Sequence, residues 1–131
     1  KEANDFIKKN GGIDLITLGI GPEYDPHIAY NTTGKSSIKS KMRVVDLHPS
    51  ISKKLSVLCK GSPWQAPTGG ITLGIKDILD TKKALLLAYG KDKSKSLKLA
   101  LGKKVDMKKA SASALKLHKD LEVILDKDAA A

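Results

Sequence analysis

The feature that most constrains the fold of this chain is a series of short apolar runs that alternate with segments of helical spacing. Residues 13–18 are apolar except for Asp14 and Thr17, and residues 84–89 and 121–125 form similar runs. Such runs, alternating with helical segments, are typical of a parallel sheet. We therefore expect a single α/β domain over residues 1–131, with a largely parallel sheet, flanking helices and a first strand covered on both faces.

Apolar spacing and helix-ending glycines give the expected elements. Ile51, Leu55 and Leu58 recur at helical spacing, and Gly102 is placed to end a helix that begins near residue 93. Residues 61–70 are expected to be irregular, with Trp64 packing them down. The expected helices are 2–10, 49–59, 75–80, 93–101 and 112–117, and the expected strands are 13–18, 43–47, 71–74, 84–89 and 121–125.

Charge and composition argue against a dedicated nucleic-acid-binding protein. The net charge of +10 comes almost entirely from lysines spread along the chain, Arg43 is the only arginine, and aromatic residues make up 4% of the sequence. Nucleic-acid readers favour arginine for bidentate contacts and aromatics for stacking on bases. We expect no dedicated nucleic-acid binding, although a diffuse lysine surface would attract anionic metabolites.

Cysteine, histidine and hydropathy patterns limit the chain further. No apolar run approaches the roughly 20 residues of a membrane span, so no membrane role is expected. A lone Cys59, expected in a helix core, suits a reducing, cytoplasmic location. His27, His48 and His118 are isolated from one another, so no metal site is predicted, and His118 is expected to be structural.

The long segment of residues 19–41 is the candidate functional loop. Gly19-Ile20-Gly21-Pro22 stops the first strand, and Asp25 and His27 follow directly. Ligands of open α/β sheets bind in the loops after the carboxyl ends of strands, and a carboxylate beside an imidazole can transfer protons there. Taken alone, the Asp–His pair would suit an ordinary surface loop better than a catalytic one.

Residues along almost the whole chain resemble the glucosamine-6-phosphate deaminase (isomerase) family. The loop G-I-G followed by D-P-H-I-A-Y-N resembles the family pattern G-I-G-x-D-G-H-I-A-F-N-E-P. The resemblance is to the C-terminal half of the family's domain, which is of a Rossmann-like sugar-phosphate isomerase type. It continues through R-V-V-D-L (43–47), I-T-L-G-I (71–75), L-L-L-A-Y-G (85–90), S-A-S-A-L-K-L-H (111–118) and V-I-L-D (123–126).

This resemblance implies an activity and assigns site residues. The implied reaction converts glucosamine 6-phosphate to fructose 6-phosphate and ammonia, without a metal or organic cofactor. His27 would act as acid and base in opening the sugar ring, oriented by Asp25. Lys93, in the stretch Gly90-Lys91-Asp92-Lys93-Ser94, would contact the substrate phosphate. Asn31 would either hydrogen-bond the sugar or hold the loop.

Three departures from the family pattern surround the pair. Pro26 stands where the family has glycine, and Pro22-Glu23-Tyr24 lengthens the approach by two residues. Thr32 replaces the glutamate that completes the family's proton relay, and Glu23 is a candidate to substitute for it in space. The family's phosphate-binding arginine has no match either; it falls near Val57, with Lys53, Lys54 and Lys60 close by.

Two further readings therefore remain open beside the deaminase. One is a 6-phosphogluconolactonase, a related family whose loop carries G-x-D-G-H. The other is a catalytically degenerate paralogue that binds a sugar phosphate or packs against a partner chain. The family's isomerising aspartate and its first phosphate-binding turn lie in the N-terminal half and have no counterpart here. An isolated half-domain would expose apolar sheet surface, so association or a homo-oligomer is expected.

Overall fold

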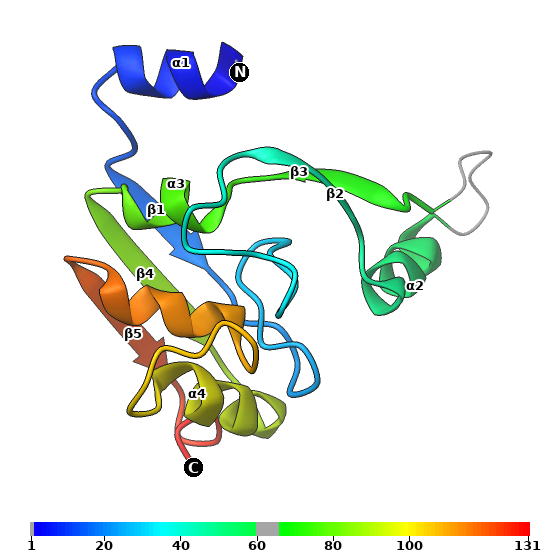
Figure 1. Cartoon of the computed structure of the whole chain (residues 1–131). Coiled ribbons are helices and arrows are strands. Elements are labelled where there is room, and N and C mark those ends of the chain that lie inside the picture. The colour runs from blue at the N-terminus through cyan, green and yellow to red at the C-terminus, as the bar shows by residue number, and fades with distance from the viewer. Residues whose placement is uncertain (1, 60–65) are drawn as a thin grey trace.

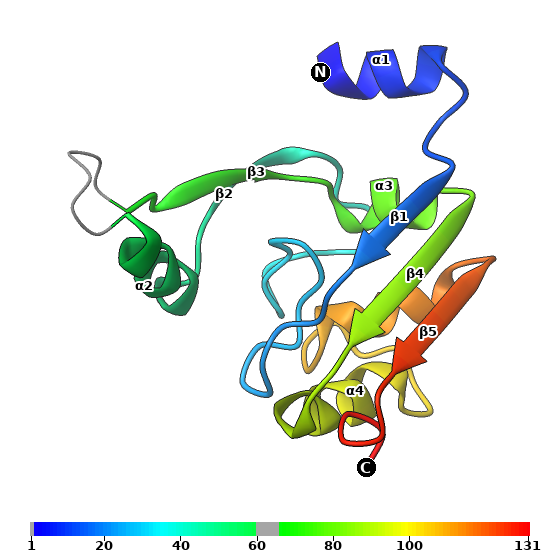
Figure 2. The same cartoon turned by 180° about the vertical axis from the view of Figure 1, so that it is seen from behind.

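Three parallel strands form the main sheet of the computed structural model, which describes residues 2–59 and 66–131. They are β1 (Leu15–Leu18), β4 (Lys83–Ala88) and β5 (Leu121–Leu125), in the order β1-β4-β5. Leu18 pairs with Leu86, and Ala88 pairs with Leu125 at the carboxyl end of the ladder. Figures 1 and 2 show the three strands running side by side in the same direction. The predicted parallel arrangement is confirmed for these strands.

One face of this sheet carries the core. The inward-facing residues of β4, Ala84, Leu86 and Ala88, are buried against α4 (Ser94–Leu101) and the 3-10 segment η2 (Ser111–Leu117). In Figure 1 both helical segments lie in front of the strands. Leu97 and Leu115 are among the apolar side chains that complete this core. Burial of these apolar surfaces is the main term that stabilises the fold.

The opposite face of the sheet is bare among the described residues. Figure 2 shows the three strands in front with no helix over them. Leu15, Leu87 and Ile124 are 52%, 43% and 50% exposed, one on each strand. The expectation that the first strand is covered on both faces is therefore wrong for the part of the chain described, because its second covering layer is not contributed by these residues.

A two-stranded ribbon and a helix form an arm that extends from the sheet. The antiparallel strands are β2 (Arg43–Asp46) and β3 (Gly69–Thr72), and α2 (Pro49–Leu58) lies at the far end of the arm (Figure 1). Both strands were expected from sequence, but they pair with each other outside the parallel sheet. Val44 and Ile71 face each other across the ribbon and are largely exposed.

The remaining helical segments are short. The helix α1 (Glu2–Lys9) has no buried residue and is followed by Gly11 and Gly12, both at positive φ. The predicted helix at 93–101 begins as a 3-10 turn, η1 (Lys91–Lys93), and continues as α4, while α3 (Ile75–Leu79) is a single turn or so, as expected.

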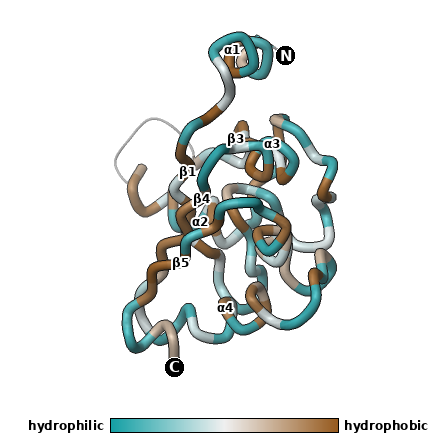
Figure 3. The backbone as a smooth tube through the Cα atoms, turned by 90° about the vertical axis from the view of Figure 1, so that its left-hand side faces the viewer, coloured by the Kyte–Doolittle hydropathy of each residue, from teal (hydrophilic) through white to brown (hydrophobic). Residues whose placement is uncertain are grey.

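Figure 3 shows hydrophobic residues following one another along β4 and β5 and a mostly hydrophilic α1. The described part of the chain contains no helix with the length and hydrophobicity that a membrane span requires. The expected packing of Trp64, and Lys60 near the missing arginine position, lie outside the described residues.

Candidate functional site

The loop between β1 and β2, residues 19–42, has no regular secondary structure but is firmly held. Ile28 and Asn31 are fully buried, and Pro26 is among the most buried side chains of the protein. Two hydrogen bonds from the start of η2 hold the loop. Ala112 N–H donates to Pro26 O at 3.0 Å, and Ser111 Oγ donates to Asn31 O at 2.5 Å. A loop this well anchored can hold side chains in fixed geometry.

Within this loop Asp25 and His27 are hydrogen-bonded to each other. Asp25 Oδ2 lies 2.9 Å from His27 Nδ1, and Asp25 Oδ1 accepts the backbone N–H of Thr33 at 2.8 Å. Burial acts to raise the pKa of Asp25, but hydrogen bonds from His27 and Thr33 and the charge on His27 outweigh it. The pKa falls from 3.8 to about 2. Asp25 is therefore an ionised carboxylate at neutral pH.

An ionised Asp25 fixes which nitrogen of His27 carries the proton. Because the carboxylate only accepts hydrogen bonds, His27 Nδ1 must be the donor, which leaves the Nε2 lone pair as the acceptor of the neutral ring. The His27 side chain is 14% exposed. This arrangement supplies a positioned imidazole that can accept and return a proton through Nε2.

Gly21 and Pro26 shape the backbone around the pair. Gly21 N–H donates to His27 O at 2.8 Å, and a Cβ on Gly21 would lie 2.6 Å from His27 Nδ1, so only glycine fits there. His27 N–H donates to Asp25 O at 2.7 Å, which closes a three-residue turn centred on Pro26. The negative φ that proline imposes suits an inverse γ-turn. Proline thus fits this loop in place of the family's glycine.

The side-chain amide of Asn31 forms hydrogen bonds with other groups of the protein. Its Nδ2 donates to Ile28 O at 3.1 Å and to Leu73 O at 2.8 Å, and its Oδ1 accepts from Arg43 at 3.1 Å. These contacts join the loop to the end of β3 and to the arm. The sugar contact and the loop-holding role expected from sequence both stay predictions, and these contacts are the ones that the second role requires.

Lys93 lies beside a pocket at the same end of the sheet. The pocket, of about 330 Å³, is formed at the carboxyl ends of β1 and β4, where Gly19 and Ile20 meet the turn after β4. Lys93 Nζ is 3.5 Å from Asp92 in a partly exposed pair. The loop that carries His27 and the turn that carries Lys93 thus border the same edge. The residues lining the pocket are Gly19, Ile20, Leu87, Ala88, Tyr89, Asp92 and Lys93.

The residues at the departures from the family pattern make other contacts. Glu23 pairs with Lys95 of α4 at 3.1 Å, whereas Asp25 is the carboxylate hydrogen-bonded to His27 among the described residues. Tyr24 lies against the ring of His48, with ring centroids 5.8 Å apart, and His48 Nδ1 caps α2. Thr32 lines a separate surface hollow with Arg43.

Other polar residues of interest lie away from this edge. Buried His118 accepts Asp120 N–H at Nδ1 and therefore donates from Nε2 to Thr81 Oγ1, 3.0 Å away. These contacts are structural, as predicted. No group of three or more His, Cys, Asp or Glu side chains that could hold a metal ion occurs within residues 2–59 and 66–131.

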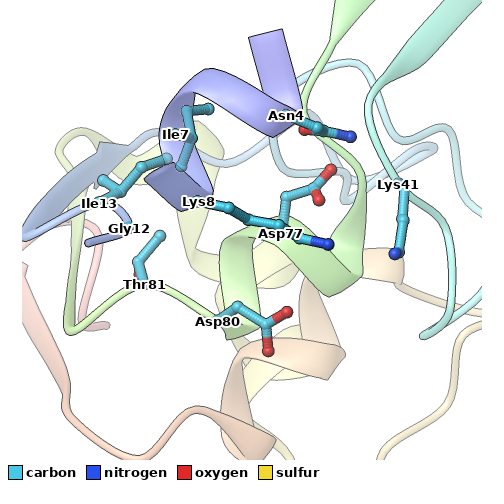
Figure 4. A pocket seen from close by; sticks show the side chains of 9 residues that line it. All are labelled: Asn4, Ile7, Lys8, Gly12, Ile13, Lys41, Asp77, Asp80 and Thr81. Atoms are coloured by element: carbon cyan, nitrogen blue, oxygen red, sulfur yellow. The ribbon is translucent and has the colours of Figure 1, made fainter. Parts of the chain in front are cut away.

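A small pocket of about 100 Å³ lies between α1 and α3, shown in Figure 4. Lysines and carboxylates gather around it, including Lys8, Lys41, Asp77 and Asp80 (Figure 4). Both carboxylates already have partners, because Asp77 accepts Gly74 N–H at 3.0 Å and Asp80 pairs with Lys76. Ile13 and Thr81 place this pocket at the amino ends of the strands, opposite the ligand-binding edge of an open α/β sheet.

Sequence reasoning missed the groups that hold the acid–base pair. Thr33 binds Asp25 through its N–H and accepts Ser111 N–H at Oγ1, 3.2 Å away. Ser111 is 78 residues from Thr33 along the chain, so no local pattern links them. The available signal was the run of small residues at 110–114, which permits this close approach.

Comparisons with known proteins agree with the sequence resemblance. No protein-family model matches the chain. The chain is 39% identical over 130 residues to a glucosamine-6-phosphate deaminase of Clostridium botulinum (strain Langeland), covering 99% of the chain and 51% of the relative. It is 38% identical over 133 residues to one of Clostridium novyi, covering 99% and 53%. The chain thus spans about half the length of the curated relatives it matches.

Solved structures of a deaminase and a lactonase share this fold. A monomeric glucosamine-6-phosphate deaminase superposes with a TM-score of 0.83 at 32% identity, covering 98% of this chain and 52% of the other. A 6-phosphogluconolactonase from Trypanosoma cruzi gives a TM-score of 0.63 at 25% identity, over 89% and 40%. The predicted α/β fold and the predicted resemblance to the deaminase family, with lactonases as neighbours, are confirmed.

Proposed function

From this resemblance to the glucosamine-6-phosphate deaminases, we propose that the chain is the C-terminal half of a deaminase domain of that type. It supplies the group that opens the sugar ring. The observation that carries the proposal is the Asp25–His27 pair, a buried carboxylate 2.9 Å from an imidazole on a braced loop after β1. The substrate proposed is glucosamine 6-phosphate, and the products are fructose 6-phosphate and ammonia.

His27 Nε2 is the proposed acid and base of ring opening. In this step His27 Nε2 takes the proton of the O1 hydroxyl and returns it to O5 as the C1–O5 bond breaks, which leaves an open-chain aldehyde and the neutral imidazole. Asp25 keeps the proton on Nδ1 and stabilises the imidazolium that forms in between. The low pKa of Asp25, about 2, ensures that this carboxylate stays charged throughout.

Lys93 is the proposed contact for the substrate phosphate. Its side chain lies at the edge of the pocket formed with Gly19 and Ile20, at the start of α4. A helix N-terminus and a lysine together favour an anion. Asn31, whose amide is satisfied by protein groups, is proposed to position the loop rather than to bind the sugar.

The rest of the reaction is proposed to need the other half of such a domain. By resemblance, the base that moves a proton from C2 to C1 and the first phosphate-binding turn lie there. The full reaction therefore belongs to a polypeptide of about the length of the relatives, acting in the cytoplasm without a cofactor and open to assembly as a homo-oligomer.

A lactonase activity is the second candidate, and Thr32 favours it. Glu23 is paired with Lys95, so the described loop offers His27 one carboxylate, Asp25. One carboxylate and one imidazole suffice to activate a water molecule against a lactone carbonyl. The lactonase from Trypanosoma cruzi shares the fold at 25% identity. A degenerate paralogue, which binds the sugar phosphate without turnover, is the remaining alternative.

Coupled detection of ammonia and fructose 6-phosphate from glucosamine 6-phosphate tests the proposal. The assay uses the full polypeptide that carries this sequence, a His27→Ala variant and a His48→Ala control at the N-cap of α2. Turnover that is lost in His27→Ala and kept in His48→Ala supports the deaminase. Hydrolysis of 6-phosphogluconolactone, with no ammonia released from glucosamine 6-phosphate, would support the lactonase. Binding of glucosamine 6-phosphate without either reaction would support the paralogue.

A further inference from the structure

One carboxylate ties together the ends of two neighbouring strands beside the proposed phosphate contact. Asp126 follows β5 directly, and both of its oxygens lie 3.1 Å from the backbone nitrogen of Gly90, which follows β4 after one residue. Asp126 Oδ1 also accepts Ala129 N–H at 2.8 Å. The last backbone pair of these strands is Ala88 with Leu125. The Asp126 side chain therefore continues the connection between β4 and β5 beyond the point where the ladder stops.

The turn that Asp126 holds is the one that carries Lys93. Gly90 has a φ of +87°, and its carbonyl accepts Lys93 N–H at 3.1 Å, so the chain reverses sharply into η1. Among the described residues, Asp126 makes the hydrogen bond that ties residues 90–93 to a separate element. Loss of this bond would leave the turn held by its own hydrogen bond and by its continuation into α4.

We propose that Asp126 is a positioning residue for the phosphate subsite. It clamps the Gly90 amide so that the turn presents Lys93 to the pocket at the carboxyl ends of β1 and β4. This inference rests on the proposed function, because it assumes that Lys93 binds the phosphate. Asp126 itself is negatively charged and would repel a phosphate, so its contribution is through geometry.

The negative charge of Asp126 allows a test that separates its electrostatic effect from its positioning effect. Removal of a negative charge near an anion site should strengthen anion binding if only charge matters. Removal of the clamp should instead weaken it, because the turn loses its register. Asp126→Asn removes the charge and replaces one acceptor oxygen by an NH2 group, while Asp128→Asn makes the same charge change two residues away at an exposed position. Asp126→Asn should therefore weaken anion binding, whereas Asp128→Asn should leave it unchanged or slightly tighter.

The experiment measures binding of inorganic phosphate and of glucosamine 6-phosphate to the full polypeptide, with the amide resonance of Gly90 followed by NMR. For Asp126→Asn we expect a shifted Gly90 resonance and affinity for both ligands about fivefold weaker or more. For Asp128→Asn we expect affinity that is unchanged or slightly tighter. Asp126→Glu, which keeps two acceptor oxygens, should recover part of the loss.

Lys93→Met separates failure of this inference from failure of the proposed function. If Lys93→Met leaves phosphate binding unchanged, the proposed phosphate contact is wrong and the role of Asp126 falls with it. If Lys93→Met weakens binding but Asp126→Asn behaves like Asp128→Asn, the site stands and the positioning role is overturned. Weakening by both Lys93→Met and Asp126→Asn, with the Gly90 shift, supports it.

Discussion

The two faces of the three-stranded sheet differ in what covers them. On one face Ala84, Leu86 and Ala88 are buried beneath α4 and η2. On the other face Leu87, the next residue after Leu86, is 43% exposed, and Ile124 beside it is 50% exposed. Adjacent residues of one strand thus lie in a completed core and on an open apolar surface.

This difference shows how much of a site a half-length chain can build. The covered face supplies η2, whose first residues hold the loop of Asp25 and His27, so the acid–base pair is organised within this chain. The turn of Lys93 stands at the same edge, with Asp126 of the neighbouring strand as its anchor. None of the described residues covers the open face, and the curated relatives are about twice as long as this chain.

Matched substitutions in β4 should produce the largest contrast. Leu86→Ala removes a fully buried side chain and should lower the free energy of unfolding by about 3 kcal/mol. Leu87→Ala on the open face, tested in a protein of residues 1–131, should lower the free energy of unfolding by under about 1 kcal/mol. Urea unfolding of both variants gives the comparison. Equal costs in residues 1–131 would mean that the two faces are buried alike in solution.

The pKa of Asp25, in the loop held by η2 on the covered side, predicts that the stability of the fold depends on pH. Its folded-state pKa, about 2, lies below the ordinary value of 3.8, so the fold favours the carboxylate. The resulting stability, about 2 kcal/mol, is fully present above the unfolded pKa and is lost as the pH falls toward 2. Stability curves between pH 6 and pH 2 should show this loss in the native sequence.

Asp25→Asn is the variant that isolates this term. It should flatten the loss between pH 5 and pH 2, while Asp128→Asn, at an exposed position, should leave it in place. Curves of native and Asp25→Asn proteins that stay parallel through this range would show that the carboxylate is not stabilised by His27 and Thr33.

Charges placed on the open face should have the smallest effect on stability and a clear effect on association. Residues 1–131 alone are expected to associate through Leu15, Leu87 and Ile124. Leu87→Lys with Ile124→Lys should convert the associated species to a monomer in analytical ultracentrifugation, with the free energy of unfolding changed by under about 1 kcal/mol. A native chain that is already a monodisperse monomer would contradict the expectation.

Sequence patterns located the elements well because the apolar runs are local. The strand around residues 84–89 and the helix ending at Gly102 were found to within a residue or two, since burial on one side imposes a period that can be counted. The pairing of β2 with β3 outside the main sheet could not be found in this way, because strand pairing depends on contacts distant in sequence.

The candidate site shows the same division. Asp25 and His27 could be paired from their spacing, and the structure brings them to 2.9 Å. The bonds from Thr33 and Ser111, which hold the pair, join residues up to 80 positions apart and leave no local signal. Exposed apolar sheet surface was predicted from the resemblance to a half-domain, but the apolar run of residues 13–18 by itself predicted cover on both faces. Such a run does not show which residues supply the second cover, and none of the described residues does.

Anomerisation of glucose 6-phosphate tests the central claim most directly, because interconversion of its α and β forms requires ring opening and closure but no isomerising base. Exchange NMR would measure the rate with the full polypeptide, with His27→Ala and with His48→Ala. We expect an acceleration that His27→Ala reduces at least tenfold and that His48→Ala retains. Equal rates with the native protein and His27→Ala would contradict the claim that the Asp25–His27 pair opens the sugar ring.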